Sequence, residues 1–471
     1  MDGCKNYRYR CEQYEYERRD DRTYRSQDFF FHGYKSITMK AQQRIFFDFL
    51  RFCIGAADGI PASVKDANWG VLYDIAKKQA LIGVLFHGIQ QLPKDLAPDG
   101  DLLMTWMGME QRIKQQNMCL FMDSAKVCKN FKDIGFRNCI LKGQGNALLY
   151  PDPYMRTPGD IDIYLNGGRK RIMEYVDKIC PNQVMRYHHV DFPVMKTPIE
   201  VHFTPSYMFC PWHNLRMQKW FGKVMDLQCS NVVTLPDGYG EITVPTLSFN
   251  VVYILSHLYR HVFTEGIGLR QLLDYYFVIE KFFSRQSNNQ NSFSKTHPSS
   301  LTLKGGSTSH PSPLSSEERD VAGDAIALPE FWYRQRSLCP QGAADDCLTP
   351  QSCDYLSAGA LQQELKHLGL WKFAGAVMFV LHEVFGLEEE KMIAPMNEKE
   401  GAFLLDEIMR GGNFGQYDDR LGDKKGEGKV HRYFRMSLRN MRFVKHYPSE
   451  AICEPLFRTW FWVWKKLNAT K

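Results

Sequence analysis

Two short stretches decide the fold: NCILKGQG at residues 138–145 and GDIDIYL at residues 159–165. In the first stretch, a short apolar run ends at Lys142 and Gly143, which is typical of a buried strand followed by a turn. In the second, charged or polar residues alternate with apolar ones, which is the pattern of a half-buried strand. Together the stretches predict a strand, a Gly-containing turn and a further strand.

The two aspartates of the second stretch define a candidate site. Asp160 and Asp162 are two positions apart, so both carboxylates project from the same face of a strand. Two carboxylates so close repel each other unless a cation lies between them. Mg²⁺ suits this position, because it accepts carboxylates and keeps places for phosphate oxygens. An aspartate pair by itself is more often a solvated strand face, so its meaning depends on the residues around it.

Three neighbouring features favour a phosphoryl-transfer site. The turn Lys142–Gly145 would let backbone N–H groups and a helix N-terminus approach a phosphate. Arg156 lies four residues before Asp160, within reach of a triphosphate. Glu200, in the apolar context of Ile199–His202, puts a third acid on a later strand. A third carboxylate can bind a second metal ion and take the proton from an attacking hydroxyl.

This arrangement resembles the DNA polymerase beta-type nucleotidyltransferase superfamily, whose pattern is a Gly-containing turn, an acid pair one strand later and an acid on a third strand. Within it, residues 141–162 resemble a bacterial family usually described only as uncharacterised nucleotidyltransferases. Aminoglycoside nucleotidyltransferases are more distantly similar, through the acid-x-His of residues 200–202. The resemblance implies three catalytic and metal-binding residues, Asp160, Asp162 and Glu200. It also implies four nucleotide-binding residues: Lys142, Gly143, Gln144 and Arg156.

One residue departs from the superfamily pattern. Gln144 stands where the superfamily often has Ser or Gly, so the hydroxyl that would contact a phosphate is missing, and Lys142 or Arg156 would have to compensate. Gln144 therefore favours an alternative interpretation, a catalytically silent nucleotide-binding relative that acts as a sensor or scaffold. A nucleic-acid-directed transferase is a further alternative, but the ordered chain has no dense basic stripe.

The expected reaction is transfer of a nucleoside monophosphate from an NTP to an acceptor, with release of pyrophosphate. Mg²⁺ is the expected cofactor, with Mn²⁺ as an alternative. Asp160 and Asp162 would hold the metal against the triphosphate, and Glu200 would act as base or second-metal ligand. The acceptor, which the sequence does not identify, would be a small molecule, a sugar or a protein. A nucleic acid is a disfavoured partner.

Composition is that of a soluble globular protein. The 471 residues are 44% hydrophobic and 24% charged, with a formal net charge of +6, and this length predicts two or three domains. The 13 cysteines form no CxxC pair and the chain does not open like a secretory signal, so we expect reduced thiols and a cytoplasmic location. The apolar stretch Trp371–Leu387 is interrupted by charged residues and too short to span a bilayer.

We predict an α+β protein, in which a small mixed-sheet nucleotidyltransferase core is flanked by N- and C-terminal helical regions. Residues 1–38 mix Arg, Asp, Glu and Tyr without periodicity, which predicts a disordered tail. A translation start at Met39 in place of Met1 is an alternative. The polar, low-complexity residues 284–353 predict a disordered insertion. The remaining regions are an N-terminal helical region at 39–134, the core at 135–246, and a C-terminal helical domain at 247–283 and 354–471.

Helical and strand patterns follow this division. We expect a helix that begins after Asp66 or Asn68, a long helix over 102–131, and a helix at 168–180. Further helices are expected at 251–261, 269–283, 361–385, 399–409 and 430–442. Additional strands are expected at 184–189, 194–195 and 199–203.

The helical half supplies weaker candidates. His257 and His261 share a helix face, where packing or substrate contact is a better interpretation than a zinc site, because the glutamate of the zinc-protease motif is missing. Arg270 and Asp274 have the spacing of an intrahelical ion pair. The glycine-rich segment 410–415 favours a helix end over a phosphate-binding loop.

Overall fold

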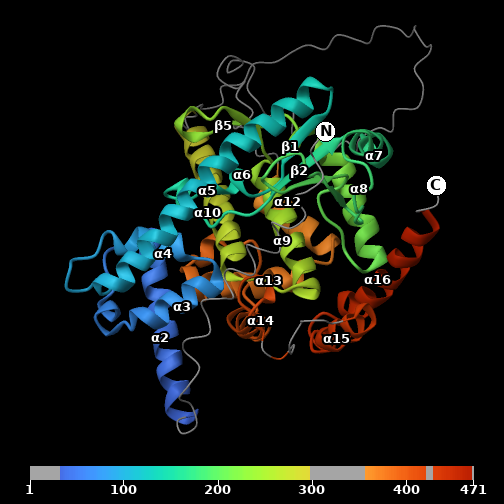
Figure 1. Cartoon of the computed structure of the whole chain (residues 1–471). Helices are drawn as coiled ribbons and strands as arrows, with labels where there is room; N and C mark the ends of the chain where they lie inside the picture. The colour runs from blue at the N-terminus through green and yellow to red at the C-terminus, as the bar shows by residue number, and fades with distance from the viewer. Residues whose placement is uncertain (1–31, 297–355, 419, 421–427, 469–471) are drawn as a thin grey trace, which may run out of the picture.

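The computed structural model describes residues 32–296, 356–418, 420 and 428–468. These residues form a mostly helical structure around a small mixed sheet, which confirms the predicted α+β class. Figure 1 shows the sheet in the upper half of the molecule, with helices on both sides. The cysteines that the structure describes are free thiols.

The central sheet has the strand order β1-β2-β4-β3. Strands β2 and β4 are parallel, whereas β1 runs antiparallel to β2 and β3 antiparallel to β4. A separate antiparallel hairpin is formed by β5 and β6. The strands are β1 (Arg137–Ile140), β2 (Ile161–Asn166), β3 (His189–Asp191), β4 (Ile199–His202), β5 (Val232–Thr234) and β6 (Glu241–Thr243).

One face of the sheet packs on a compact apolar layer. Ile163 and Val201 project from this face and are fully buried against Phe131 of helix α5 (Gly100–Asp133) and Ile172 of helix α7 (Gly168–Ile179). Because side chains alternate along a strand, the acidic residues of β2 and β4 project from the opposite face. The apolar layer thereby fixes which way the candidate site points.

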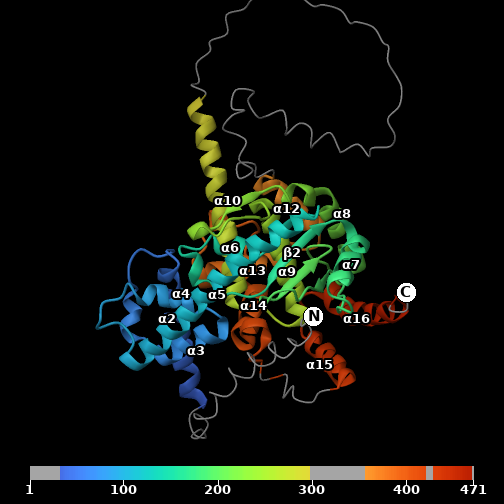
Figure 2. The same ribbon diagram turned by 45° about the horizontal axis from the view of Figure 1, so that its top comes forward.

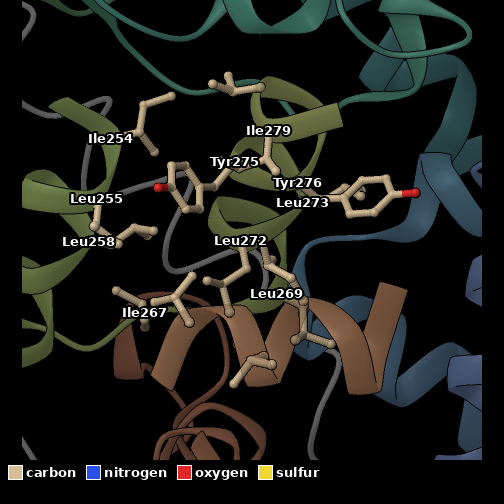
Figure 3. Close-up of a cluster of buried hydrophobic side chains, with 14 of the residues drawn as sticks. Ile254, Leu255, Leu258, Ile267, Leu269, Leu272, Leu273, Tyr275, Tyr276 and Ile279 are labelled. Atoms are coloured by element: carbon tan, nitrogen blue, oxygen red, sulfur yellow. The ribbon is translucent and has the colours of Figure 1, made fainter. Parts of the chain in front are cut away.

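The opposite face is covered by the C-terminal helices. Helix α9 (Leu247–Thr264) is buried along nearly its whole length and packs against α10 (Leu269–Thr296). Figure 3 shows apolar side chains of the two helices interlocked, among them Leu258, Leu272 and Tyr275. The remaining helices of this half are α8 (Pro211–Gln228), α12 (Ala358–His367), α13 (Trp371–Val380), α14 (Glu398–Gly411), α15 (Lys429–Met441) and α16 (Pro448–Asn468).

The N-terminal helices begin earlier than the sequence predicts. Helix α2 (His32–Cys53) includes residues 32–38, which we assigned to the disordered tail, while residues 1–31 lie outside the described residues. Asn68 caps α3 (Trp69–Gln79), as expected, by accepting a hydrogen bond from the Val71 N–H. Helix α4 (Ile82–Ile89) follows. Short helical turns complete the fold: η3 (Ala62–Asp66), α6 (Gln144–Ala147), η4 (Pro153–Met155), η5 (Pro236–Gly238), η7 (Leu381–Phe385), η8 (Glu389–Lys391) and η9 (Asn413–Gly415).

Several predicted elements need correction. The strand expected at 184–189 is reduced to an isolated bridge between Met185 and Val190 and to the first residue of β3, His189. Residues 194–195 form no strand, because the chain bends over residues 194–197 between β3 and β4. The helix expected at 361–385 is broken at Gly369, whose φ of 76° ends α12. Helix α10 continues to Thr296, into the segment predicted as an insertion, and residues 297–355 lie outside the described residues.

Helix α8, the β5–β6 hairpin and helix α16 were not predicted. The predicted end of a helix near residue 410 is confirmed, because Gly412, with a φ of 62°, is the C-cap of α14. Among the described residues, no helix is long and apolar enough to cross a membrane.

Candidate active site

The parallel pairing of β2 and β4 brings the two acidic strands into register. Asp162 and Glu200 are direct partners across the two strands, so their carboxylates lie side by side on one face. His202 projects from the same face two residues further along β4. This juxtaposition joins residues that are far apart in the sequence into one buried polar group.

Asp162 is held by two cationic or hydrogen-bonding partners. Its Oδ2 lies 3.0 Å from Nζ of Lys142, and its Oδ1 lies 3.0 Å from Nε2 of His202. Only 2% of the Asp162 side chain is exposed. Burial would raise the pKa of this carboxyl, but Lys142 and His202 outweigh burial and hold the pKa of Asp162 below its usual value. Asp162 is therefore ionised inside the protein.

Lys142 owes its position to the end of β1. The Leu141 N–H donates to the Asp162 carbonyl, which carries the β1–β2 pairing one residue past the strand and delivers Lys142 beside the acids. Burial lowers the pKa of the Lys142 ammonium, yet the charges of Asp162, Asp160 and Glu200 outweigh it, so that the pKa is raised overall. Lys142 thus carries a positive charge among three carboxyls.

Glu200 lies in a less favourable environment for its charge. Burial, together with the nearby charges of Asp160 and Asp162, raises the pKa of Glu200 to about 8. Its Oε2 lies 3.2 Å from Nδ1 of His189 and 3.8 Å from Nε2 of His202. A carboxyl with this pKa can hold or accept a proton near neutral pH.

Asp160 precedes β2 and completes the acidic group. Burial and the charge of Asp162 raise the pKa of Asp160, whereas Lys142 and Arg270 act to lower it. The three acids predicted from the sequence therefore interact electrostatically in the folded chain. Their mutual repulsion is what a divalent cation would relieve.

The donor set fits a small divalent metal ion. Ligand atoms of Asp162, Glu200 and His202 all lie within 4.8 Å of one another. Carboxylate oxygens are the ligands that Mg²⁺ prefers, and an imidazole nitrogen suits Mn²⁺ better than Mg²⁺. Asp160, which interacts with Asp162 and Glu200 through its charge, offers a further oxygen donor at the edge of the group.

The glycine turn has the backbone that the sequence predicts. Gly143 has a φ of 70°, a conformation that residues with a Cβ rarely adopt, and it starts the short helix α6. Close packing explains the second glycine, because a Cβ at Gly145 would lie 2.8 Å from Cγ1 of Val244. Gln144 is buried, and neither its side-chain oxygen nor its nitrogen has a hydrogen-bond partner among the described residues.

Arg156 is paired with a buried carboxylate of helix α10. Its Nε and Nη2 each donate to the carboxylate of Asp274 at 2.8 Å, and both side chains are buried. Tyr150 donates a further hydrogen bond to Asp274 at 2.7 Å. Arg156 therefore joins the segment before β2 to helix α10, and its role in nucleotide binding stays a prediction.

This pairing also corrects the predicted intrahelical ion pair. Asp274 is bound by Arg156, not by Arg270. Arg270 donates instead to the carbonyl of Thr157 at 3.3 Å and lies 5.7 Å from the ring centroid of Phe414. Because Arg270 is close enough to Asp160 to influence its pKa, it brings a buried positive charge to the rim of the acidic group.

Helix α9 contributes a polar face that sequence reasoning recognised only in part. His257 and His261 pack edge to face with ring centroids 4.4 Å apart, which agrees with a packing role. Both accept a hydrogen bond from Nη2 of Arg260, at 3.3 Å and 3.1 Å. Arg260 was missed, although its place between two histidines of one helix face could have indicated it.

Three buried histidines lie next to one another beside Glu200. His188, His189 and His202 lie with ring centroids 4.4–5.1 Å apart, and their ligand atoms lie within 4.8 Å of one another. Burial and neighbouring positive charges lower the pKa of His188, and the same causes lower that of His189 to about 2, so both rings are neutral. His202 could have been found from sequence, since it shares a strand face with Glu200, whereas His188 precedes β3 and His189 begins it, paired with His202.

Comparison with known proteins agrees with this geometry. Residues 65–297 match the model of a family described as uncharacterised nucleotidyltransferases. The match includes the glycine turn, the aspartate pair and Glu200, and it supports a nucleotidyltransferase, a transferase that uses a nucleotide substrate. Neither the curated proteins nor the solved structures that were searched gave a match.

Proposed function

We propose that the chain is a metal-dependent nucleotidyltransferase, which transfers a nucleoside monophosphate from an NTP to an acceptor hydroxyl and releases pyrophosphate. The observation that carries the proposal is the register of β2 and β4, which sets Asp162 beside Glu200 with Asp160 at the rim. The family match over the same residues supports it. Mg²⁺ is the proposed cofactor, and the cytoplasm remains the proposed location.

We assign the residues of the site separate roles in binding the metal and the nucleotide. Asp160, Asp162 and Glu200 would hold the metal, which when bound would neutralise charge on the phosphates. Lys142 would offer its ammonium to a phosphate oxygen once Asp162 has another cationic partner. His202 would orient Asp162 through its hydrogen bond.

Glu200 is the proposed base. The acceptor oxygen would attack the α-phosphorus, the bond to the pyrophosphate oxygen would break, and the acceptor proton would pass to Glu200. Glu200 must be ionised to accept this proton, and a bound cation would favour the ionised form by relieving the repulsion from Asp160 and Asp162 that raises the pKa of Glu200 in the metal-free chain. The burial of the Asp162 and Glu200 side chains, which are 2% and 16% exposed, would limit the access of water.

Transfer of label from α-³²P-labelled NTPs tests this function. The full chain is incubated with each NTP, Mg²⁺ or Mn²⁺, and a broad set of small-molecule, sugar and protein acceptors. We expect a labelled product that chelation abolishes and that an Asp160→Ala/Asp162→Ala variant does not form. The exposed Asp177→Asn serves as the matched control and should keep full activity. Absence of product with every NTP, together with absence of metal-dependent NTP binding, would rule the enzyme out.

A catalytically silent nucleotide-binding relative is the second candidate. The ammonium of Lys142 already supplies a positive charge at Asp162, and Gln144 replaces the serine of the superfamily turn. In this case the chain would bind an NTP without labelling any acceptor. Calorimetric titration with a non-hydrolysable NTP analogue, run beside the transfer assay, separates the two candidates.

A further inference from the structure

The last two helices leave a row of large apolar side chains in solvent. On α15 they are spaced by four, four and three residues, and on α16 the spacing is the same, so that each row follows one helix face. Their side chains are between 43% and 71% exposed. We call these residues the C-terminal apolar stripe: Val430, Phe434, Leu438, Met441, Ile452, Leu456, Trp460 and Val463.

Among the described residues, most of the stripe makes no contact that holds the two helices in place; Trp460, half exposed, also packs with its ring centroid 5.6 Å from that of Phe457. Helix α15 contacts α16 through the Tyr433 hydroxyl, which lies 2.9 Å from the Thr459 hydroxyl, and through Arg458, 4.7 Å from the Tyr433 ring centroid. Phe443 and Phe457 pack into the interior. Figures 1 and 2 show both helices at the periphery, with α16 extending away from the body toward the C-terminus. The helices are thus anchored by other faces and present the stripe outward.

The exposed charges around the stripe are positive. Between residues 428 and 467 the acids are Glu450 and Glu454, and both are buried, at 1% and 3% exposure. Arg432 of α15, Lys445 of the turn between the helices and Lys466 of α16 are exposed. The described part of this hairpin therefore combines an apolar stripe with a cationic rim.

The apolar stripe and its cationic rim together favour one kind of binding partner. An exposed apolar surface of this kind marks a protein or membrane contact. A second copy of the chain would bring the same cationic side chains face to face, which is unfavourable. A bilayer with anionic headgroups satisfies both features, because apolar side chains enter the acyl boundary while Lys and Arg meet the headgroups. Trp460 and Trp462, both about half exposed, are of the residue type enriched at membrane interfaces.

We propose that α15 and α16 form a docking surface for an anionic lipid bilayer, on which the chain lies without crossing it. The proposal is independent of the transfer reaction, since it rests on residues outside the candidate active site. Burying several exposed apolar side chains supplies the attraction, and the cationic rim makes it dependent on anionic lipid and on ionic strength.

Flotation with lipid vesicles tests the docking surface in the full chain. The vesicles contain phosphatidylcholine alone, or phosphatidylcholine and phosphatidylglycerol in equal amounts. We expect binding to the anionic vesicles, weakened by added salt. A Phe434→Ser/Leu438→Ser/Trp460→Ser variant should bind at least about tenfold more weakly, since each exposed side chain would otherwise be buried in lipid.

The matched control changes exposed apolar residues elsewhere. Met104→Ser/Met122→Ser alters helix α5, where both side chains are also exposed, and should bind vesicles like the unchanged chain. Circular dichroism checks that the stripe variant is folded, and its transfer activity on a soluble acceptor reports separately on the active site. Equal binding by the stripe variant, or none to anionic vesicles, would overturn the proposal. The proposal would also be overturned if light scattering showed the unchanged chain to be a dimer and the stripe variant to be a monomer.

Discussion

The chemistry of Asp162 depends on two side chains that the sequence places well apart from it. A buried carboxylate without partners would take up a proton, because water no longer stabilises its charge. Lys142 and His202 supply that stabilisation at 3.0 Å each. For Glu200, on the neighbouring strand, burial and the charges of Asp160 and Asp162 outweigh Lys142, and the pKa rises to about 8. The pKa values of two acids in direct register are therefore shifted in opposite directions by their different neighbours.

His202 offers a residue-scale test of this division. His202→Ala removes the hydrogen bond to Asp162 Oδ1 and should weaken metal-dependent NTP binding by about 10–100-fold, the usual effect of losing a partner that orients a metal ligand. Isothermal titration calorimetry with and without Mg²⁺ measures it. The exposed His367→Ala is the control and should bind normally. If His202→Ala leaves the metal-dependent affinity for NTP unchanged, His202 has only a packing role.

At the scale of elements, the Arg156–Asp274 pair fastens the chain before β2 to α10. Both side chains are buried, and Tyr150 adds a hydrogen bond to the same carboxylate. Burial would raise the pKa of Asp274, but Arg156 outweighs it and the pKa is lowered. The pair therefore stays charged in the interior and sets the distance between the aspartate strand and the helices that cover it.

Asp274→Asn should destabilise the protein strongly. The change leaves the Arg156 guanidinium buried without a counter-charge, which costs about 3–5 kcal/mol of unfolding free energy. Urea denaturation monitored by tryptophan fluorescence measures the loss. Asp406→Asn is the control, because it removes an exposed ion pair. The Asp406 and Arg410 side chains are each 55% exposed, and a pair of this kind contributes only about 0–1 kcal/mol to the unfolding free energy. Similar losses in both variants would contradict the buried-pair interpretation.

At the scale of the whole molecule, the C-terminal helices are joined by a charged cluster. Asp418 accepts hydrogen bonds from Arg420 and Arg442, and Glu407 of α14 lies within 2.8 Å of Arg420. Burial raises the pKa of Asp418, but the two arginines outweigh it and lower the pKa to about 2. The cluster links α14 to the C-terminal end of α15, one of the two helices that carry the proposed lipid surface.

This cluster predicts an acid-sensitive part of the stability. A carboxyl whose pKa is lowered by folding stabilises the native state above its unfolded pKa, and the contribution is lost as pH falls toward the folded value. For Asp418 the window lies between its usual pKa near 3.8 and about 2. The stability difference between the unchanged chain and Asp418→Asn should therefore shrink by about 1 kcal/mol from pH 5 to pH 3. Urea denaturation at the two pH values checks it, and a pH-independent difference would contradict it.

Periodicity and motif spacing predicted much of the architecture. Alternation in residues 160–165 predicted β2, and three- and four-residue steps predicted the long helix α5 and the C-terminal helices. The strands expected near residues 184–195 were wrong, since apolar residues in turns and strands look alike over such short lengths. Helix α8 was missed although its buried residues, among them Met217, Trp220 and Phe221, follow helical spacing.

The sequence by itself determined the acids and the turn that are candidates for the site. Asp160, Asp162 and Glu200 sit on strand patterns, and Gly143 occupies a backbone conformation that favours glycine. These features are local, so neighbouring residues suffice to reveal them.

Only the tertiary structure decided which side chains meet those acids. Lys142 and His202 flank Asp162, while Arg156, expected to face a phosphate, is bound by Asp274 on a helix more than a hundred residues away. Strand register and helix packing set these contacts, and both depend on how apolar faces from distant segments come together. No local sequence pattern determines which side chains contact the buried acids. The charge of a buried group depends on the partner that packing places within hydrogen-bonding distance.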